Sequence, residues 1–233
     1  MKKKYSQNFP FCFYDLAAKY LPEDKSAVVI DIGCGECRFE NYLKLWDGYE
    51  NLTVLDGNPD SVAKLKQKHK NSNVLRYTAP ERLPFEDKSV NYIFCGHLIE
   101  HLYYEQLYKL FKELDRVLKV DGILVVSTPL MWDGFFWNLD HVKPYGPSVF
   151  TIYFCGLKSG DASYELISKD YKVEELVYRY FTHVDVHNTV GSSIKMFDFL
   201  IQASRYISRE LGIKKYTRSG YTIILRKENE KIQ

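Results

Sequence analysis

The sequence has no apolar run of about 20 residues, the length that a helix needs to cross a bilayer. It also has no clear secretory leader. Lys2, Lys3 and Lys4 precede an apolar stretch, but Pro10 and Asp15 interrupt that stretch and no small-residue cleavage site follows. We therefore expect a cytoplasmic protein without stable insertion into a membrane.

Basic clusters are equally scarce. No stretch rich in lysine or arginine recurs after the first four residues, and the net charge of the chain is only +2. Extended contacts with phosphate backbones need such clusters, so we expect no nucleic-acid partner. Nothing in the sequence indicates an oligomeric state.

Cysteines are few, and their spacing does not suggest disulfides. Five is an odd number, which favours a reducing compartment. Cys34 and Cys37 form a C-x-x-C pair at a predicted helix start, where thiols become more acidic, so a redox role remains open. No second pair completes a four-thiolate zinc site, and we predict no bound metal.

The clearest pattern lies between Ala27 and Leu43. Four apolar residues lead to Asp31, a loop with Gly33 and Gly35 follows, and apolar residues then recur at helical spacing. A strand, a glycine loop and a helix in this order form a nucleotide-type site. A dinucleotide fingerprint needs a third glycine at position 38, and arginine stands there instead.

The loop resembles motif I of the class I S-adenosylmethionine (SAM)-dependent methyltransferases, Asp-x-Gly-x-Gly-x-Gly. Asp31, Gly33 and Gly35 match this motif, and Cys37 replaces its third glycine. We expect the Cys37 side chain to narrow the pocket near the methionine end of the cofactor.

Three further segments support the resemblance. Asp56 ends the second predicted strand, where a carboxylate can accept hydrogen bonds from ribose hydroxyls. Leu83, Pro84 and Phe85 match a family segment, in which Ala79 stands in place of the acid that commonly contacts adenine. Residues 114–129 resemble the family's helix, turn and fifth strand.

The resemblance implies SAM as the cofactor and a site formed by the ends of the first four strands. The predicted cofactor-binding residues are Asp31, Gly33, Cys34, Gly35, Asp56, Gly57, Asn58, Ala79, Pro80, Cys95, Gly96 and His97.

The predicted fold is α/β: one doubly wound, Rossmann-like domain with helices on both faces of a seven-stranded, mostly parallel sheet. Its last strand is antiparallel and inserted between strands five and six. We assign residues 1–25 to an N-terminal lead and cap helix, and residues 26–233 to the SAM-binding domain. An aromatic-rich acceptor lid is predicted at about 129–155.

The expected elements are short and alternate along the chain. Strands are predicted at 26–32, 52–55, 73–76, 90–94, 123–127, 171–178 and 221–225. Helices are predicted at 11–20, 37–46, 107–118, 148–168 and 194–211. Residues 58–61 are predicted to start a further helix, with Asp60 or Ser61 as its N-cap.

Methyl transfer to oxygen or a protonated nitrogen needs a base, and histidine is suited to this near pH 7. The candidates are His141 and then His97, with Asp140 as a partner that orients His141. The acceptor is predicted to be a small molecule, a sugar or a lipid-linked intermediate. His141 could equally be a structural residue in a packed loop.

Two other functions remain open. One is a SAM-binding regulatory protein without turnover. The other is a zinc hydrolase, because residues 97–101 read H-x-x-E-H and would place His97 and His101 on one helix face.

Overall fold

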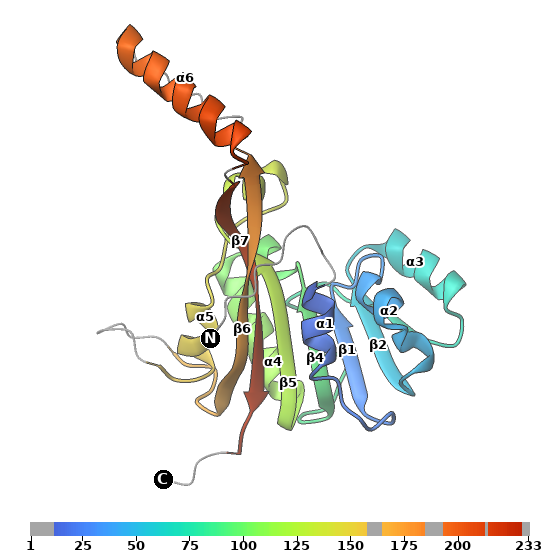
Figure 1. Ribbon diagram of the computed structural model, residues 1–233. Coiled ribbons are helices and arrows are strands. Elements are labelled where there is room, and N and C mark those ends of the chain that lie inside the picture. Colours follow the sequence, from blue (N-terminus) through green and yellow to red (C-terminus); the bar gives the residue numbers. More distant parts are fainter. Residues whose placement is uncertain (1–11, 158–164, 185–192, 213, 230–233) are drawn as a thin grey trace.

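A seven-stranded sheet forms the centre of the computed structural model (Figure 1). The structure describes residues 12–157, 165–184, 193–212 and 214–229. The strands are β1 (Val28–Ile32), β2 (Asn51–Asp56), β3 (Asn73–Arg76), β4 (Val90–Gly96), β5 (Leu118–Pro129), β6 (Tyr171–Val184) and β7 (Lys214–Lys227).

The strand order is β3-β2-β1-β4-β5-β7-β6. The pairs from β3 to β5 are parallel, whereas β7 runs antiparallel to both β5 and β6. The predicted insertion of the last strand between five and six is therefore confirmed. The order reverses beside β1, and ligands of such sheets bind at this point, beyond the carboxyl ends of the strands.

Six α-helices and three short 3-10 turns accompany the strands in the described part of the chain, and α1 precedes β1. The helices are α1 (Cys12–Ala18), α2 (Arg38–Leu43), α3 (Pro59–Lys68), α4 (Tyr104–Val117), α5 (Ser148–Tyr153) and α6 (Lys195–Glu210). The turns are η1 (Leu45–Asp47), η2 (Ile99–His101) and η3 (Asp133–Trp137). None of the described helices is both long and apolar enough to span a membrane.

The sheet is covered on both faces. Alternate residues of β1 point to opposite sides, so Ile30 and Ile32 join the cluster under α4 and α5, while Val29 joins the cluster under α1 and α2. The cluster under α4 includes Leu110 and Leu114, both fully buried. The predicted arrangement of helices on both faces is confirmed.

Some predicted boundaries were wrong. The helix expected at 37–46 is broken, because Lys44 adopts a left-handed conformation (φ 55°) that ends α2 and starts η1. The cap of α3 is Asn58, not Asp60 or Ser61, and its side chain accepts hydrogen bonds from both of those amides. The helix expected at 148–168 is only six residues long before residues 158–164, which lie outside the described part.

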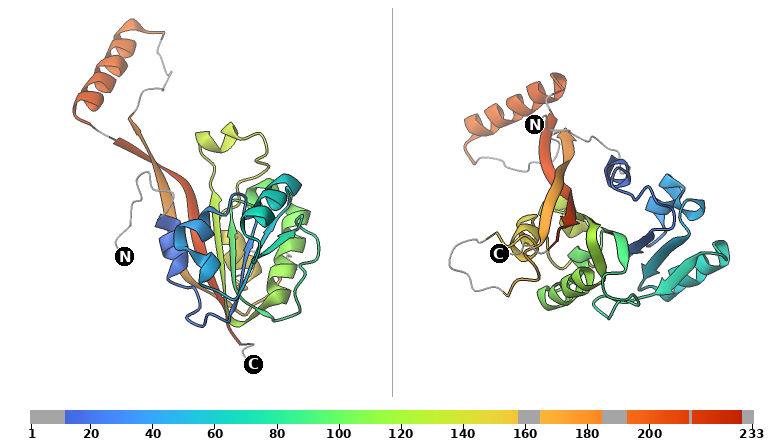
Figure 2. Two further views of the ribbon diagram at one scale, coloured as in Figure 1. Left: turned by 90° about the vertical axis from the view of Figure 1, so that its right-hand side faces the viewer. Right: turned by 90° about the horizontal axis from the view of Figure 1, so that it is seen from below.

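Strands β6 and β7 are longer than predicted, with 14 residues each. Their hairpin continues beyond the body of the sheet, and α6 stands clear of the sheet at its far end (Figures 1 and 2). Sequence periodicity predicted the helix at 194–211, but not its position away from the core.

Candidate active site

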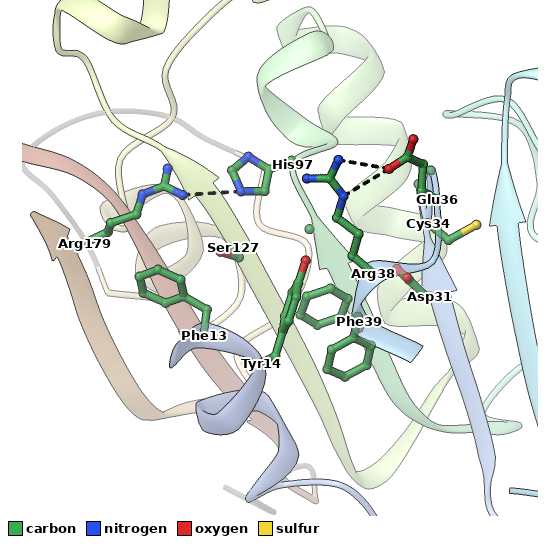
Figure 3. A pocket seen from close by; sticks show the side chains of 14 residues that line it. Phe13, Tyr14, Asp31, Cys34, Glu36, Arg38, Phe39, His97, Ser127 and Arg179 are labelled. Carbon is green, nitrogen blue, oxygen red and sulfur yellow. Dashed lines mark hydrogen bonds and ion pairs between the residues drawn. The ribbon is translucent and has the colours of Figure 1, made fainter. Parts of the chain in front are cut away.

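Two pockets, each of about 430 Å³, flank the loop after β1. Both are lined by Gly33, Gly35 and His97, so they adjoin at these residues. The first pocket lies over β4 and β5 and reaches α1 and β6 (Figure 3). The second lies toward β2 and β3. Both are at the topological switch point of the sheet.

The glycine loop is fixed to the neighbouring strand. The amides of Gly33 and Cys34 both donate to the Leu55 carbonyl, at 2.8 and 3.1 Å. Gly33 and Gly35 have φ values of +79° and +53°, which glycine adopts without steric cost. A Cβ at Gly33 would also come within 3.2 Å of the Leu98 side chain.

Cys37, which stands where the motif has its third glycine, adopts a backbone conformation that favours glycine. Its φ is 53°, in the left-handed region. Its side chain is fully buried in a cluster with Val54 and Val62, and it lines neither pocket. The expectation that Cys37 narrows the pocket was therefore wrong, because the side chain points into the core.

The cysteine pair has the environment of structural thiols. Cys34 and Cys37 are free and buried. The hydrogen bond with Cys37, followed by burial, raises the pKa of the Cys34 thiol. A reactive cysteine needs the opposite shift, so the structure argues against a redox role for this pair.

Asp56 is held by the backbone around it. One carboxylate oxygen (Oδ2) accepts from the Gly35 amide at 2.8 Å, and the other (Oδ1) accepts from the Asn58 amide at 2.8 Å. These bonds connect the carboxyl end of β2 to the glycine loop. A carboxylate has about four acceptor positions, so two remain for hydroxyl donors in the second pocket.

Most of the predicted cofactor residues meet around the loop. The first pocket is lined by Asp31, Cys34 and Gly96, and the second by Asp56, Gly57, Asn58 and Ala79. Two predicted residues line neither pocket. Cys95 is fully buried, and Pro80 follows a cis peptide bond beside Ala79.

Asp31 forms a buried acidic pair with Glu40 of α2, a residue that sequence reasoning missed. Both carboxyls are nearly inaccessible, and Asp31 Oδ1 and both Glu40 oxygens have no hydrogen-bond partner among the described residues. Burial first, and the neighbouring Glu40 second, raise the pKa of Asp31. Burial also raises the pKa of Glu40.

His97 is the most constrained of the candidate bases. It has a left-handed backbone (φ 55°), and its Nδ1 lies 3.1 Å from Oε1 of Glu100. Glu100 is fully buried and also accepts a hydrogen bond from the Thr128 hydroxyl, at 3.0 Å. Burial alone would raise the pKa of Glu100, but the hydrogen bonds from His97 and Thr128 outweigh it, and the pKa is lowered.

These contacts determine the tautomer of His97. An ionised Glu100 only accepts hydrogen bonds, so Nδ1 of His97 must carry hydrogen. On the other side of the ring, Nη1 of Arg179 lies 3.5 Å from Nε2, as Figure 3 shows. A guanidinium only donates, so Nε2 presents its lone pair toward the first pocket.

His141 and Asp140 line neither pocket. Nδ1 of His141 is hydrogen-bonded to the Phe135 carbonyl at 2.8 Å, so the contact expected from Asp140 is made by backbone. Asp140 is exposed, and its carbonyl is hydrogen-bonded to Nδ1 of His101 at 3.0 Å. The rings of His101 and His141 are 5.0 Å apart, and His101 lines the second pocket, so His141 lies behind a residue of the pocket wall.

One described group could hold a metal: Glu100, His101 and His141, whose ligand atoms lie within 4.8 Å of one another. His97 and His101 do not share a helix, since His97 follows β4 and His101 ends the three-residue turn η2. The zinc-hydrolase arrangement that we considered therefore has no helix to carry it in the described structure.

Eight residues that line the first pocket were not predicted from sequence, and four of them illustrate how distant elements meet there. Phe13 and Tyr14 come from α1, Arg38 from α2 and Arg179 from β6. Arg179 is 82 positions from His97, and only the pairing of β6 with β7 brings the two together. Local sequence patterns contain no signal for such a contact.

Part of the chain matches a family of known proteins. Residues 30–126 match the family described as "Methyltransferase domain". An uncharacterised protein of Methanocaldococcus jannaschii is 30% identical over 113 residues, which are 48% of this chain and 44% of that protein. The chain thus matches less than half the length of this curated relative.

Solved structures share the fold. A SAM-dependent methyltransferase from Archaeoglobus fulgidus is 22% identical, with a TM-score of 0.59 and 93% of each chain covered. A geranyl diphosphate C-methyltransferase from Streptomyces coelicolor is 11% identical, with a TM-score of 0.55 and 93% and 78% covered. Residues 30–126 of the present chain are thus similar to a methyltransferase domain, and the chain has the fold of these SAM-dependent methyltransferases.

Proposed function

We propose that the protein is a SAM-dependent methyltransferase whose acceptor is a small molecule, a sugar or a lipid-linked intermediate. The match of residues 30–126 to the methyltransferase family and the two adjoining pockets support this function. The proposal also includes a boundary between an N-terminal segment, residues 1–25, and the SAM-binding domain, residues 26–233. It further includes an acceptor lid at about 129–155.

The second pocket and the glycine loop fit the nucleoside part of SAM. The two free acceptor positions of Asp56 suit a pair of ribose hydroxyls, and Gly57, Asn58 and Ala79 line the same cavity. Asp31 lines the first pocket and places a carboxyl group on the methionine side. When bound, SAM supplies a methyl group that its sulfonium has already activated for displacement.

The observation that carries the proposal is the position of His97. It lines both pockets, so it lies where a nucleoside-binding cavity meets an acceptor-sized cavity. Glu100 orients the ring, and Nε2 can take a proton from the acceptor atom when the acceptor displaces Arg179 from this nitrogen. Glu100 thus acts as a positioning residue, and its charge would stabilise the imidazolium that forms.

The wall of the acceptor cavity is supplied by α1, α2 and β4. Phe13, Tyr14, Phe39 and Phe94 line it, together with Arg179. Several aromatic residues of segment 129–155 are instead buried in the core, including Phe135, Tyr145 and Phe150. This favours a lid that is partly packed into the core over an aromatic wall that faces the acceptor.

The experiment is a screen for transfer of labelled methyl from SAM into three pools: small metabolites, sugar nucleotides and lipid-linked saccharides. The expected result is incorporation into one pool that is lost in His97→Gln. Tight SAM binding without incorporation into any pool would favour the regulatory alternative.

A further inference from the structure

Helix α6 presents an exposed apolar face away from the core. Its apolar residues at helical spacing include Met196, Phe199, Leu200 and Ile207, all of them exposed. Phe199 is 70% exposed. Leaving this much apolar area in water is costly, because each large side chain loses about 1.5–3 kcal/mol of burial free energy.

The other face of α6 is polar. Asp198 and Gln202 lie there, on the side of the helix opposite Met196, Leu200 and Ile207. A helix with one apolar and one charged face, standing off a folded body, has the features of a segment that lies in a membrane interface. At 16 residues α6 does not span a bilayer.

The net charge around α6 indicates which kind of membrane surface the helix would bind. Residues 194–218 contain six basic and two acidic residues, a net charge of +4, whereas the whole chain, with 32 basic and 30 acidic residues, has +2. The rest of the chain is therefore net negative, and the positive charge is concentrated around α6. Anionic lipid headgroups attract such a segment.

A second exposed apolar segment lies at the same end of the molecule. Around η3, Met131, Phe136, Trp137 and Leu139 are exposed, with Trp137 at 74%. Figure 1 and the left view of Figure 2 both place η3 at the end from which the β6–β7 hairpin projects. Tryptophan is suited to the boundary between headgroups and acyl chains because its ring is apolar and its N–H is polar.

We propose that α6 docks this protein on an anionic lipid surface, with its apolar face in the headgroup region and the η3 segment as a second contact. The proposal goes beyond methyl transfer and does not depend on it. A lipid surface is favoured over a second copy of the chain as the binding partner. In a dimer formed through this face, two positively charged segments would lie against each other and repel.

The test is flotation with vesicles of phosphatidylcholine alone and with about a quarter phosphatidylglycerol. The wild type should float with the anionic vesicles, less at high salt because ions screen the attraction. The double variant Phe199→Gln/Leu200→Gln, which keeps the net charge, should weaken this binding at least tenfold. Gln202→Ser, on the polar face of the same helix, is the matched control and should stay within twofold of the wild type.

Two readouts keep the outcome interpretable. Since α6 stands clear of the sheet, both variants should keep the thermal unfolding transition of the wild type. Tryptophan emission should shift to shorter wavelength on anionic vesicles, and Trp137→Phe should reduce the shift. No flotation of the wild type, or equal flotation of the double variant, would overturn the proposal. A wild-type dimer that ignores vesicles and that the double variant dissociates would overturn it in favour of self-association.

Discussion

At the scale of single residues, His97 and its buried partner Glu100 are the centre of the proposed chemistry. General base catalysis typically contributes about 100- to 10,000-fold. We expect His97→Gln to lower the methyl-transfer rate at least 100-fold while SAM affinity changes less than threefold. His141→Gln, measured in parallel with the identified acceptor, should stay within threefold, because His141 lines neither pocket. If only His141→Gln lowered the rate, the general base would be His141 and not His97.

The lowered pKa of Glu100 has a consequence for stability. The pKa of Glu100 is lower in the folded protein than in the unfolded chain. Such a carboxyl stabilises the folded state at pH values above its unfolded pKa. This stabilisation is lost as the pH falls through the folded pKa. Denaturant titrations of wild type and Glu100→Gln should therefore differ most near neutral pH and converge in acid. A constant difference at every pH would contradict this linkage.

The buried pair of Asp31 and Glu40 should change the stability of the fold with pH in the opposite direction. Their folded pKa values are raised, so the folded state holds protons that the unfolded chain has released. The free energy of unfolding should fall as pH rises above about 4, the ordinary carboxyl range. Glu40→Gln should flatten this decline in urea titrations across pH. An unchanged slope in the variant would show that the pair is not the cause.

At the scale of elements, Arg116 of α4 connects the helix to the segment around Leu83 and Phe85. Its guanidinium donates to both of their carbonyls, at 3.0 and 2.8 Å, and pairs with Glu113 at 2.6 Å. Arg116→Ala removes these donors from two part-buried carbonyls and the charged partner from Glu113, and we expect a loss of about 2–3 kcal/mol in unfolding free energy. Arg82→Ala, exposed in the same region, should cost less than about 0.5 kcal/mol. Equal effects of the two substitutions would refute the connecting role.

Gly220 of β7 is where the hairpin meets the site. A Cβ there would lie 2.5 Å from Nη2 of Arg179 and 2.7 Å from the Thr128 carbonyl. Gly220→Ala should destabilise the protein by about 1–3 kcal/mol, because backbone must move. In Gly146→Ala the new Cβ meets nothing nearer than 3.7 Å, so thermal unfolding of that variant should be almost unchanged. A tolerated alanine at position 220 would mean that β6 and β7 are less closely packed than described.

Predictability from sequence differs between these scales. The strand and glycine loop around Gly33, and Asp56 after the second strand, were predictable because each depends on a few adjacent residues. The break of α2 at Lys44 was not, since a left-handed lysine has no local signature. The contact of Arg179 with His97 depends on pairing between distant strands, and the burial of Glu40 depends on tertiary packing.

At the scale of the whole molecule, one sheet supports three different surfaces. The glycine loop and Asp56 form the proposed nucleoside side, α1 and β6 add the proposed acceptor side, and the hairpin carries α6 away from both. Segment order and sheet topology were predictable because the family resemblance covers the ends of the strands. The outward position of α6 was not, since its amphipathic pattern equally fits packing on the sheet.

The central claim is that the cavities around the glycine loop bind SAM, and calorimetric titration of SAM and S-adenosylhomocysteine tests it most directly. We predict micromolar binding, weakened at least tenfold (about 1.4 kcal/mol) in Asp56→Ala. Asp60→Ala is the matched control: the same substitution at an exposed residue four positions on, which lines neither pocket, should bind like the wild type. Absence of binding to folded wild type, or equal binding by Asp56→Ala, would contradict the account.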